Sequence, residues 1–526
     1  MSRLMLTLSI CSNGVSGLTV WAFETIETSI RTRSAACLKY LILNFTVQKY
    51  LIISTYRAFI LFFFNTFALD FYNRDIIVLN IITKRTNALK TRNVIAGKIL
   101  VGLLLLAAVQ TTKAQSGTNS PYSQFGLGQL SEQSSGFNRG MDGLALGFHE
   151  HNQINYLNPA SYSALDSLSF IFDIGASGQV TNFKENGVKK SAKNADFEYI
   201  VAGFRVLPHF GLSFGFLPYT NVGYSYSSSS TLNNSSSTTS TDSYDGSGGI
   251  HQVYLGLGWS PFKGFSIGVN GGYLYGDYSR SLVNSFSNSY INRISKIETA
   301  DVESYMLNFG AQYTARLTKK DELTLGLAYT PGHKIGGKPE LDVISSNTST
   351  SVSDTTVYNG SNLKLEIPTS YGIGLMYNHN NQLKVGADYT LQRWGKVSEP
   401  TYSSAGGVIS YAMASGQYKD RHKVTVGAEY CPGEYSRHFL KRVHYRAGVS
   451  YATPYYYING HDGPKEMSAS LGFGIPIMNS WNNRSILNIS GSWVRRSAAN
   501  FITENTFRIN IGLTFNERWF AKWKVQ

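Results

Sequence analysis

Fourteen segments between Leu168 and Phe515 alternate apolar and polar residues, and this alternation is the strongest constraint on the fold of the chain. In the last segment every second residue is apolar: Phe507, Ile509, Ile511, Leu513 and Phe515. A period of two residues is that of a β-strand whose two faces meet different surroundings. The chain is therefore expected to be all-β.

The connections between the segments are alternately short and long. We expect strands at 167–178, 197–206, 210–220, 250–259, 265–276, 303–317, 322–330, 363–378, 382–392, 420–430, 441–452, 466–477, 484–494 and 506–515. Most have about 9–12 residues, the length that crosses a bilayer at a tilt. Long connections follow the odd-numbered segments: 179–196, 221–249, 277–302, 331–362, 393–419, 453–465 and 495–505.

An even number of strands, with short turns on one side and long loops on the other, is the pattern of outer-membrane barrels. We therefore expect a 14-stranded antiparallel transmembrane β-barrel over 167–515, in the outer membrane of a Gram-negative bacterium. The Ser-, Thr- and Gly-rich residues 225–248 are expected to form an external loop of low complexity. The alternative is a soluble β-sandwich, which would have shorter strands and no asymmetry between its loops.

The composition agrees with a barrel. Only 15% of the residues are charged and 13% are aromatic, whereas about 25% of the residues in soluble domains are charged. Of the net charge of +14, +9 lies in residues 1–114, and no dense basic run follows, which argues against a nucleic-acid partner. Of three cysteines only Cys431 lies after residue 114, so that portion can form no intrachain disulfide.

The N-terminal region reads as an export signal in an unusual position. Residues 89–114 combine basic residues, an apolar run from Ile99 to Val109 and small residues before Gln115, as in a signal peptide. Residues 1–88 are interpreted as an over-extended reading frame outside the mature protein. The alternative for them is an inner-membrane helix around Leu51–Leu69, which Arg57 and Asn65 interrupt.

Residues 115–166 do not alternate, and they are rich in Gly, Ser and Asn, with Phe, Tyr, Met and Leu at intervals. A 14-stranded barrel has a lumen too wide for its own side chains to fill. We therefore expect an N-terminal plug, or hatch, in the lumen. The alternative is a disordered tail.

This segment carries a resemblance to a known family. Asn158-Pro159-Ala160 resembles the Asn-Pro-Ala motif in the hatch of the FadL-type outer-membrane transporters. Three further stretches are similar to Bacteroidetes members of that family: Ser120–Gly128, Gly246–Gly258 and Asn516–Phe520. The resemblance implies a 14-stranded barrel, an N-terminal hatch and passive uptake of hydrophobic molecules such as long-chain fatty acids. Asn158, Pro159 and Ala160 would then be hatch or gating residues.

Four polar residues are candidates for the lumen-facing side of the strands. They are Asn308, Gln312, Arg316 and Asp388. Anchoring of the plug or lining of the pore is the expected role for them.

No nucleophile elbow, zinc-protease motif or phosphate loop occurs, so we expect neither an enzyme nor a cofactor. His149-Glu150-His151 is the one local cluster of ligand type, and solvated or hydrogen-bonded histidines explain it better than a metal.

The C-terminal strand contains Asn510-x-Gly512-x-x-Phe515, which resembles the signal read by the barrel-assembly machinery. Residues 516–526 follow it as a periplasmic tail with Trp519, Phe520 and Trp523. This tail is expected to be an interfacial aromatic anchor, with contact to a periplasmic partner as the alternative.

Two functions follow from these observations. The first is a hatch-gated channel that takes up a hydrophobic small molecule from the outer-membrane lipid. The alternative is a scaffold or shuttle barrel that binds exported proteins through its external loops, as in type IX secretion.

The signal-peptide interpretation predicts the first residue of the mature protein. Edman sequencing of the purified protein should give Gln115 or, if it is blocked, pyroglutamate there. A mature protein that starts at Met1 would contradict the interpretation.

Overall fold

The computed structural model describes residues 117–232, 238–405, 408–478 and 484–517. The regions expected to be a reading-frame extension and a signal peptide lie outside the described residues, as do residues 518–526 of the expected tail. No helix among the described residues is long and apolar enough to cross a membrane.

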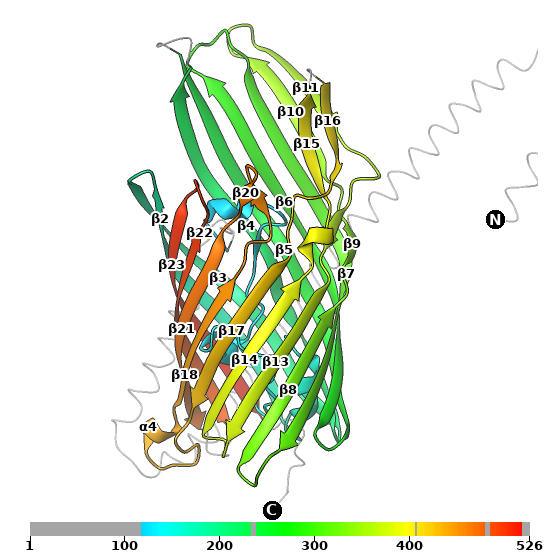
Figure 1. Ribbon diagram of the computed structural model, residues 1–526, viewed down its shortest axis with the longest axis vertical. Coiled ribbons are helices and arrows are strands. Elements are labelled where there is room, and N and C mark those ends of the chain that lie inside the picture. The colour runs from blue at the N-terminus through cyan, green and yellow to red at the C-terminus, as the bar shows by residue number, and fades with distance from the viewer. Residues whose placement is uncertain (1–116, 233–237, 406–407, 479–483, 518–526) are drawn as a thin grey trace, which may run out of the picture. The chain divides into compact units, whose positions relative to one another are not determined.

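The described residues form a closed barrel of fourteen antiparallel strands (Figure 1). These strands are β2 (Phe170–Glu185), β3 (Val188–Leu207), β4 (Phe210–Thr231), β5 (Thr239–Phe262), β6 (Phe265–Phe286), β7 (Arg293–Arg316), β8 (Asp321–Thr330), β13 (Ser370–His379), β14 (Leu383–Gln392), β17 (Arg421–Tyr430), β18 (His444–Ala452), β21 (Lys465–Met478), β22 (Arg484–Ser497) and β23 (Thr503–Glu517). Each pairs with the next, and β23 pairs with β2 from Phe170 to Lys184 to close the ring. The predicted number and order of the strands are confirmed.

The alternation separates two surfaces. On β23 the residues Phe507, Ile509, Ile511 and Phe515 are exposed on the outer face, whereas the intervening residues face inward. The same outward apolar rows occur on β8, β13 and β14: Leu325, Leu327, Tyr329, Tyr371, Ile373, Leu375, Tyr377, Leu383, Val385 and Tyr389. A continuous outer belt of large apolar side chains around a polar interior is the surface of a transmembrane β-barrel.

The long connections differ most from expectation. Residues 225–248, expected to be a loop, are largely strand, because β4 continues to Thr231 and β5 begins at Thr239. β6 and β7 likewise extend through most of 277–302, and β10 (Glu340–Asn347) and β11 (Val352–Tyr358) add two more strands at this end. Pairing with long neighbours satisfies these polar backbones, and the cross-strand pair Tyr226–Tyr244 stacks with ring centroids 4.8 Å apart. We call the resulting sheet, residues 222–231, 239–249, 277–286 and 293–301 with β10 and β11, the sheet extension (Figure 1).

The other end carries mainly tight turns, such as Pro208–His209 between β3 and β4. One connection there is longer, residues 431–443 with the short helix α4 (Phe439–Arg442). Small elements cover the lumen at the end of the long connections: β9 (His333–Gly336), β12 (Leu365–Ile367), η3 (Trp394–Lys396), β15 (Glu399–Ala405), β16 (Val408–Ala414), β19 (Tyr457–Ile458) and β20 (His461–Asp462). The barrel extends slightly past its expected C-terminal boundary, because β23 includes Asn516 and Glu517.

The outer belt predicts where a charge is tolerated. Ile511→Arg, in the middle of β23, should lower the free energy of unfolding by about 2–4 kcal/mol, because a cation at the membrane midplane loses its hydration. Denaturant titration of the barrel refolded in lipid vesicles measures this difference. Thr503→Arg, on the same face of the same strand but at its outer end, is the matched control and should change the value by about 1 kcal/mol or less. Equal losses at both positions would contradict the assigned belt.

Candidate functional site

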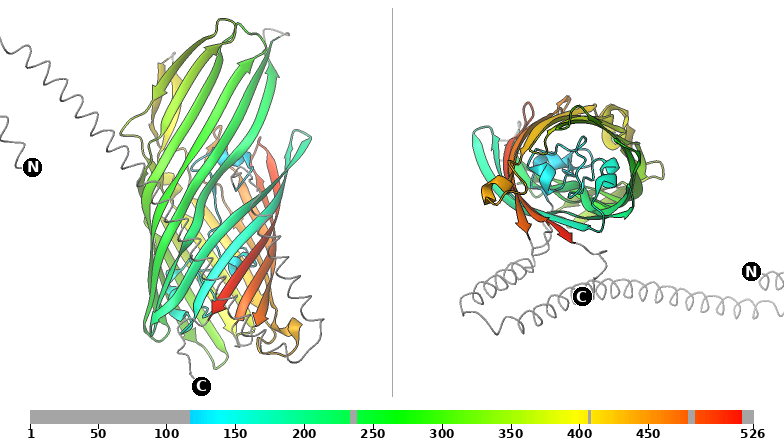
Figure 2. Two further views of the ribbon diagram at one scale, coloured as in Figure 1. Left: turned by 180° about the vertical axis from the view of Figure 1, so that it is seen from behind. Right: turned by 90° about the horizontal axis from the view of Figure 1, so that it is seen from below.

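Residues 117–166, here called the inner segment, lie within the ring of strands, as the view along the barrel shows (Figure 2). They contain η1 (Pro121–Gln124), β1 (Gln129–Leu130), α3 (Gly136–Arg139) and η2 (Pro159–Ala164). Among these residues His151 alone is exposed. The segment therefore packs against the inner wall along its whole length.

A belt of glycines on the inner wall allows this packing. A Cβ added at Gly326 of β8 would lie 1.9 Å from the carbonyl oxygen of Leu146, and one at Gly448 of β18 would lie 2.3 Å from the carbonyl carbon of Met141. Such distances are sterically impossible. The two backbones can therefore touch at these positions only because glycine has no side chain to separate them. At twelve glycines on ten strands an added Cβ would lie 1.9–3.2 Å from an atom of the inner segment, and we call them the glycine belt: Gly211, Gly256, Gly258, Gly268, Gly310, Gly326, Gly372, Gly374, Gly427, Gly448, Gly472 and Gly512.

The Asn-Pro-Ala motif begins η2 and packs against this belt. Asn158 is fully buried, and its side-chain oxygen accepts a hydrogen bond from the backbone N–H of Ala160, 3.2 Å away. Its amide group also donates to the carbonyl oxygen of Leu146 at 2.9 Å. Pro159 lies against Gly268 and Gly310, so the motif joins two turns of the inner segment to β6 and β7. Asn is suited to this position because it caps the helix with one side-chain atom and donates with the other.

Two of the four candidate lumen residues hold the inner segment by its backbone. Asp388 on β14 accepts hydrogen bonds from the N–H groups of Ala145 and Leu146, at 2.7 and 2.9 Å. Gln312 on β7 donates to the carbonyl oxygens of Leu146 and Phe148, at 2.9 and 2.8 Å. Together they satisfy backbone groups of a segment that has little regular secondary structure of its own.

The other two candidates have different positions. Asn308 is buried on the inner face of β7, and its side-chain oxygen has no hydrogen-bond partner among the described residues. Arg316 is on the same face but at the very end of β7, where its side chain is 83% exposed and pairs with Glu322 at 3.1 Å. The structure thus brings Asp388, Gln312 and Asn308 into the lumen and leaves Arg316 at the rim.

The three residues of the His-Glu-His cluster have three separate partners. His149 lies 2.7 Å from the side-chain oxygen of Gln312, Glu150 accepts from Lys384 at 2.6 Å, and His151 lies 2.8 Å from Asp166. The hydrogen bond with Asp166 raises the pKa of His151. Among the described residues no group of three or more His, Cys, Asp and Glu side chains is placed to hold a metal ion.

Sequence reasoning missed the charged residues that pair across the lumen. Arg139 of α3 forms an ion pair with Glu198 of β3, 3.0 Å apart, and both side chains are buried. Glu198 can reach it because a β-bulge opposite Gly175 and Ala176 adds one residue to β3 at this point. In the sequence this bulge shows only as a break in the alternation of β3 at Glu198.

A second network joins the inner segment to four strands. Lys384 of β14 lies between Glu150 and Glu429 of β17, at 2.6 and 3.3 Å, and Arg446 of β18 pairs with Glu429 at 2.7 Å. Arg446 also donates to Asn488 of β22 at 2.6 Å. Every charge in the network has an opposite partner, as buried charges require.

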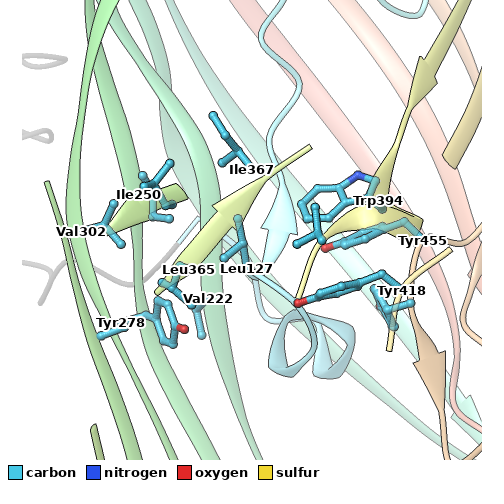
Figure 3. Packing of buried hydrophobic residues seen from close by; sticks show 14 of the residues in the cluster. Leu127, Val222, Ile250, Tyr278, Val302, Leu365, Ile367, Trp394, Tyr418 and Tyr455 are labelled. Atoms are coloured by element: carbon cyan, nitrogen blue, oxygen red, sulfur yellow. The ribbon is translucent and has the colours of Figure 1, made fainter. Parts of the chain in front are cut away.

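An apolar cluster, which includes the first part of the inner segment, lies in the lumen at the end of the long connections (Figure 3). Leu127 of the inner segment shares this cluster with residues of the wall and of β12: Val222, Ile250, Val302, Leu365 and Ile367. On the other side Trp394 packs on Tyr455 and Tyr418, with ring centroids 4.6 and 5.5 Å away. We call it the mouth cluster; it is the largest of the three buried apolar clusters among the described residues and also contains Tyr456.

Comparison with known proteins gives a family and a fold. A family model described as BamG matches residues 96–526. No curated protein matches the chain.

The solved structures that are similar include a TodX deltaS2S3 mutant monoaromatic hydrocarbon channel, with 14% identity, a TM-score of 0.51, and coverage of 73% of this chain and 99% of that one. A FadL homologue of Pseudomonas aeruginosa is similar at 14% identity and a TM-score of 0.49, covering 73% and 98% of the two chains. The toluene transporter TbuX of Ralstonia pickettii is similar at 13% identity and a TM-score of 0.48, covering 75% of this chain and 99% of that one. At these identities the likeness concerns the fold alone, and at that level the resemblance to FadL-type barrels is confirmed.

The glycine belt predicts a steric effect with a matched control. Gly448→Val should displace the inner segment or lower the free energy of unfolding by about 1–3 kcal/mol, because the added carbons overlap the backbone of Met141. Thermal loss of the compact barrel band on a gel and protease cleavage within 117–166 report the two results. Gly491→Val on β22, where an added Cβ meets nothing within 4 Å, should leave both unchanged. Equal behaviour of the two variants would refute a close-packed seat.

Proposed function

The chain belongs to the BamG family, and we propose that it is a non-enzymatic outer-membrane barrel with a closed lumen that acts as a binding scaffold for other proteins. The observation that carries this proposal is the glycine belt. It seats the inner segment directly on ten strands of the wall, mostly by its backbone, which is the construction of a permanent core.

The hydrogen bonds of the inner segment support a fixed position. Asp388 and Gln312 bind four of its backbone groups, and Glu198 and Lys384 pair with its buried charges. A buried polar group that loses its partner costs about 1–3 kcal/mol, and a charged one costs more. Movement of the whole segment would break these bonds together, so a channel that opens by releasing it would need a large compensating interaction.

The sheet extension supplies a surface for partners. It continues the wall with strands rich in Ser, Thr and Asn instead of the apolar residues of the belt. Its strand β11 pairs only with β10 among the described residues, and Val352 to Val357 are exposed. An exposed polar strand edge can accept an extended segment of another chain through main-chain hydrogen bonds. Exported proteins that reach the cell surface are the partners we propose.

The outer membrane is the proposed location. The apolar belt requires a bilayer, and tight turns at one end with long connections at the other match the orientation of outer-membrane barrels. We propose that the barrel-assembly machinery inserts the chain by reading the Asn510-x-Gly512-x-x-Phe515 pattern of β23.

A second candidate function is uptake of hydrophobic molecules, including long-chain fatty acids, and the mouth cluster favours it. Leu127 and Tyr122 of the inner segment form part of this cluster, so a shift of that end alone would uncover an apolar site. Asn158, Pro159 and Ala160 would then hold the lower part of the hatch while its upper part opens. Two of the similar solved structures are described as a hydrocarbon channel and a toluene transporter.

A deletion strain complemented with two barrels separates the two functions. One barrel is the full chain, and the other has residues 338–360, which contain β10 and β11, replaced by a short Gly-Ser linker. If the protein is a scaffold, uptake of labelled oleate and toluene is the same in all strains. The amounts of specific surface proteins, measured by quantitative proteomics, then recover only with the full chain.

Reduced uptake in the deletion strain, restored by both barrels, would establish transport and overturn the scaffold. A full-length barrel with Lys319→Gln and Lys320→Gln in the opposite turn controls for general effects of surface changes.

A further inference from the structure

A cleft of about 640 Å³ opens on the outside of the barrel, on the side where β2, β22 and β23 are neighbours. None of the residues discussed so far as holding the inner segment lines it. Its lining residues come from the ends of these strands and the connection between β22 and β23: Lys184, Glu185, Asn186, Arg495, Asn500, Phe501, Thr503 and Asn505.

The strand register places this cleft directly above the apolar belt. Trp493, Phe507 and Val180 are paired across β22, β23 and β2 on the outer face and form one row of the belt. Two residues further along each strand, the next outward row is Arg495, Asn505 and Asn182. The following pair is Thr503 and Lys184. The outer surface thus changes from apolar to cationic and amide side chains within one row.

The lining combines charge, amides and one aromatic ring. Lys184 and Arg495 form no ion pair in the described part of the chain, and one carboxylate, Glu185, lies beside them. Lys189 of β3 is exposed and stands opposite Lys184 in the ladder, so a third cation lies on the same face beside the cleft. Phe501 is held in place from inside the barrel, where its ring centroid lies 5.2 Å from that of Tyr122.

We propose that this cleft binds the phosphorylated sugar headgroup of a glycolipid in the outer leaflet, an inference that rests on the proposed outer-membrane location. Lys184 and Arg495 would hold the phosphate by charge-assisted hydrogen bonds, and Arg can do so through two parallel N–H groups. The amides of Asn500 and Asn505 can donate to and accept from sugar hydroxyls.

Position decides between a glycolipid and a soluble ligand. A headgroup in the cleft leaves its acyl chains beside Trp493, Phe507 and Val180, the apolar row immediately below. A free sugar phosphate would make no use of that row. The face of Phe501 offers an apolar surface to the sugar ring.

Binding to the purified full-length barrel in detergent tests the proposal. The probes are bisphosphorylated lipid A, the same lipid A after dephosphorylation, and glucosamine 1-phosphate, with Kd measured by native mass spectrometry. The wild-type barrel should bind phosphorylated lipid A at least about tenfold more tightly than either other probe. The double variant Lys184→Gln/Arg495→Gln should lose at least about tenfold in Kd for it, which corresponds to about 1.4 kcal/mol.

The control variant is Lys319→Gln/Lys320→Gln, which removes the same charge from exposed lysines in the turn between β7 and β8. It should bind phosphorylated lipid A like the wild type, and the compact barrel band on a gel verifies that both variants are folded. Equal Kd values for the two variants, or for phosphorylated and dephosphorylated lipid A, would overturn the proposal. Equally tight binding of glucosamine 1-phosphate would overturn the assignment to a lipid. Because no partner protein or transported molecule enters the assay, failure here leaves the scaffold proposal untouched, and the reverse also holds.

Discussion

Close contact between the inner segment and the glycine belt of the wall governs how this barrel is filled. Fourteen strands enclose a space that their own side chains cannot fill, and the inner segment fills it with backbone as well as side chains. That backbone carries polar groups that need partners in a place shielded from water. Glycine brings the two chains close, and Asp388, Gln312 and Asn158 then supply the hydrogen bonds.

The interior is therefore graded along the barrel axis. Ion pairs and amides dominate around α3 and η2, where Arg139 meets Glu198 and Lys384 meets Glu150. At the end of the long connections the mouth cluster adds packed aromatic and aliphatic side chains, with the ion pair of Arg496 and Glu466 at that end as well. Both proposed binding activities use surfaces outside the lumen. Partner proteins would bind the polar sheet extension, and the glycolipid would bind the cationic cleft above the belt. Uptake through the barrel would have to begin at the mouth cluster, since it offers a large apolar surface at that end of the interior.

The strands could be predicted from the sequence because alternation is a local property. In each of the fourteen segments the alternating apolar and polar residues show by themselves that the strand has two different faces. The same reasoning failed where a loop was inferred from the composition of a segment, because composition does not show whether the segment pairs with a neighbouring strand. Residues 225–248 are low in complexity, yet β4 and β5 pair through most of them, because each strand offers the other a continuous row of backbone partners. Arg316 has the right parity for the lumen, but parity does not say how far along the axis a residue lies. The sequence also carries no sign of the glycine belt, which makes room for a second layer of chain inside the wall.

The sequence by itself determined the class of fold, the number of strands and which side chains face outward, since these follow from a period of two residues and the lengths of the connections. Three findings came from the three-dimensional arrangement alone. They are the wall residues that touch the inner segment, the separate partners of His149, Glu150 and His151, and the shared cleft of Lys184, Arg495 and Phe501. The physical reason is that the inner segment has no periodic pattern and its partners are up to several hundred residues away in the chain. These contacts are therefore a property of the folded barrel, in which β2 pairs with β23 and encloses the inner segment.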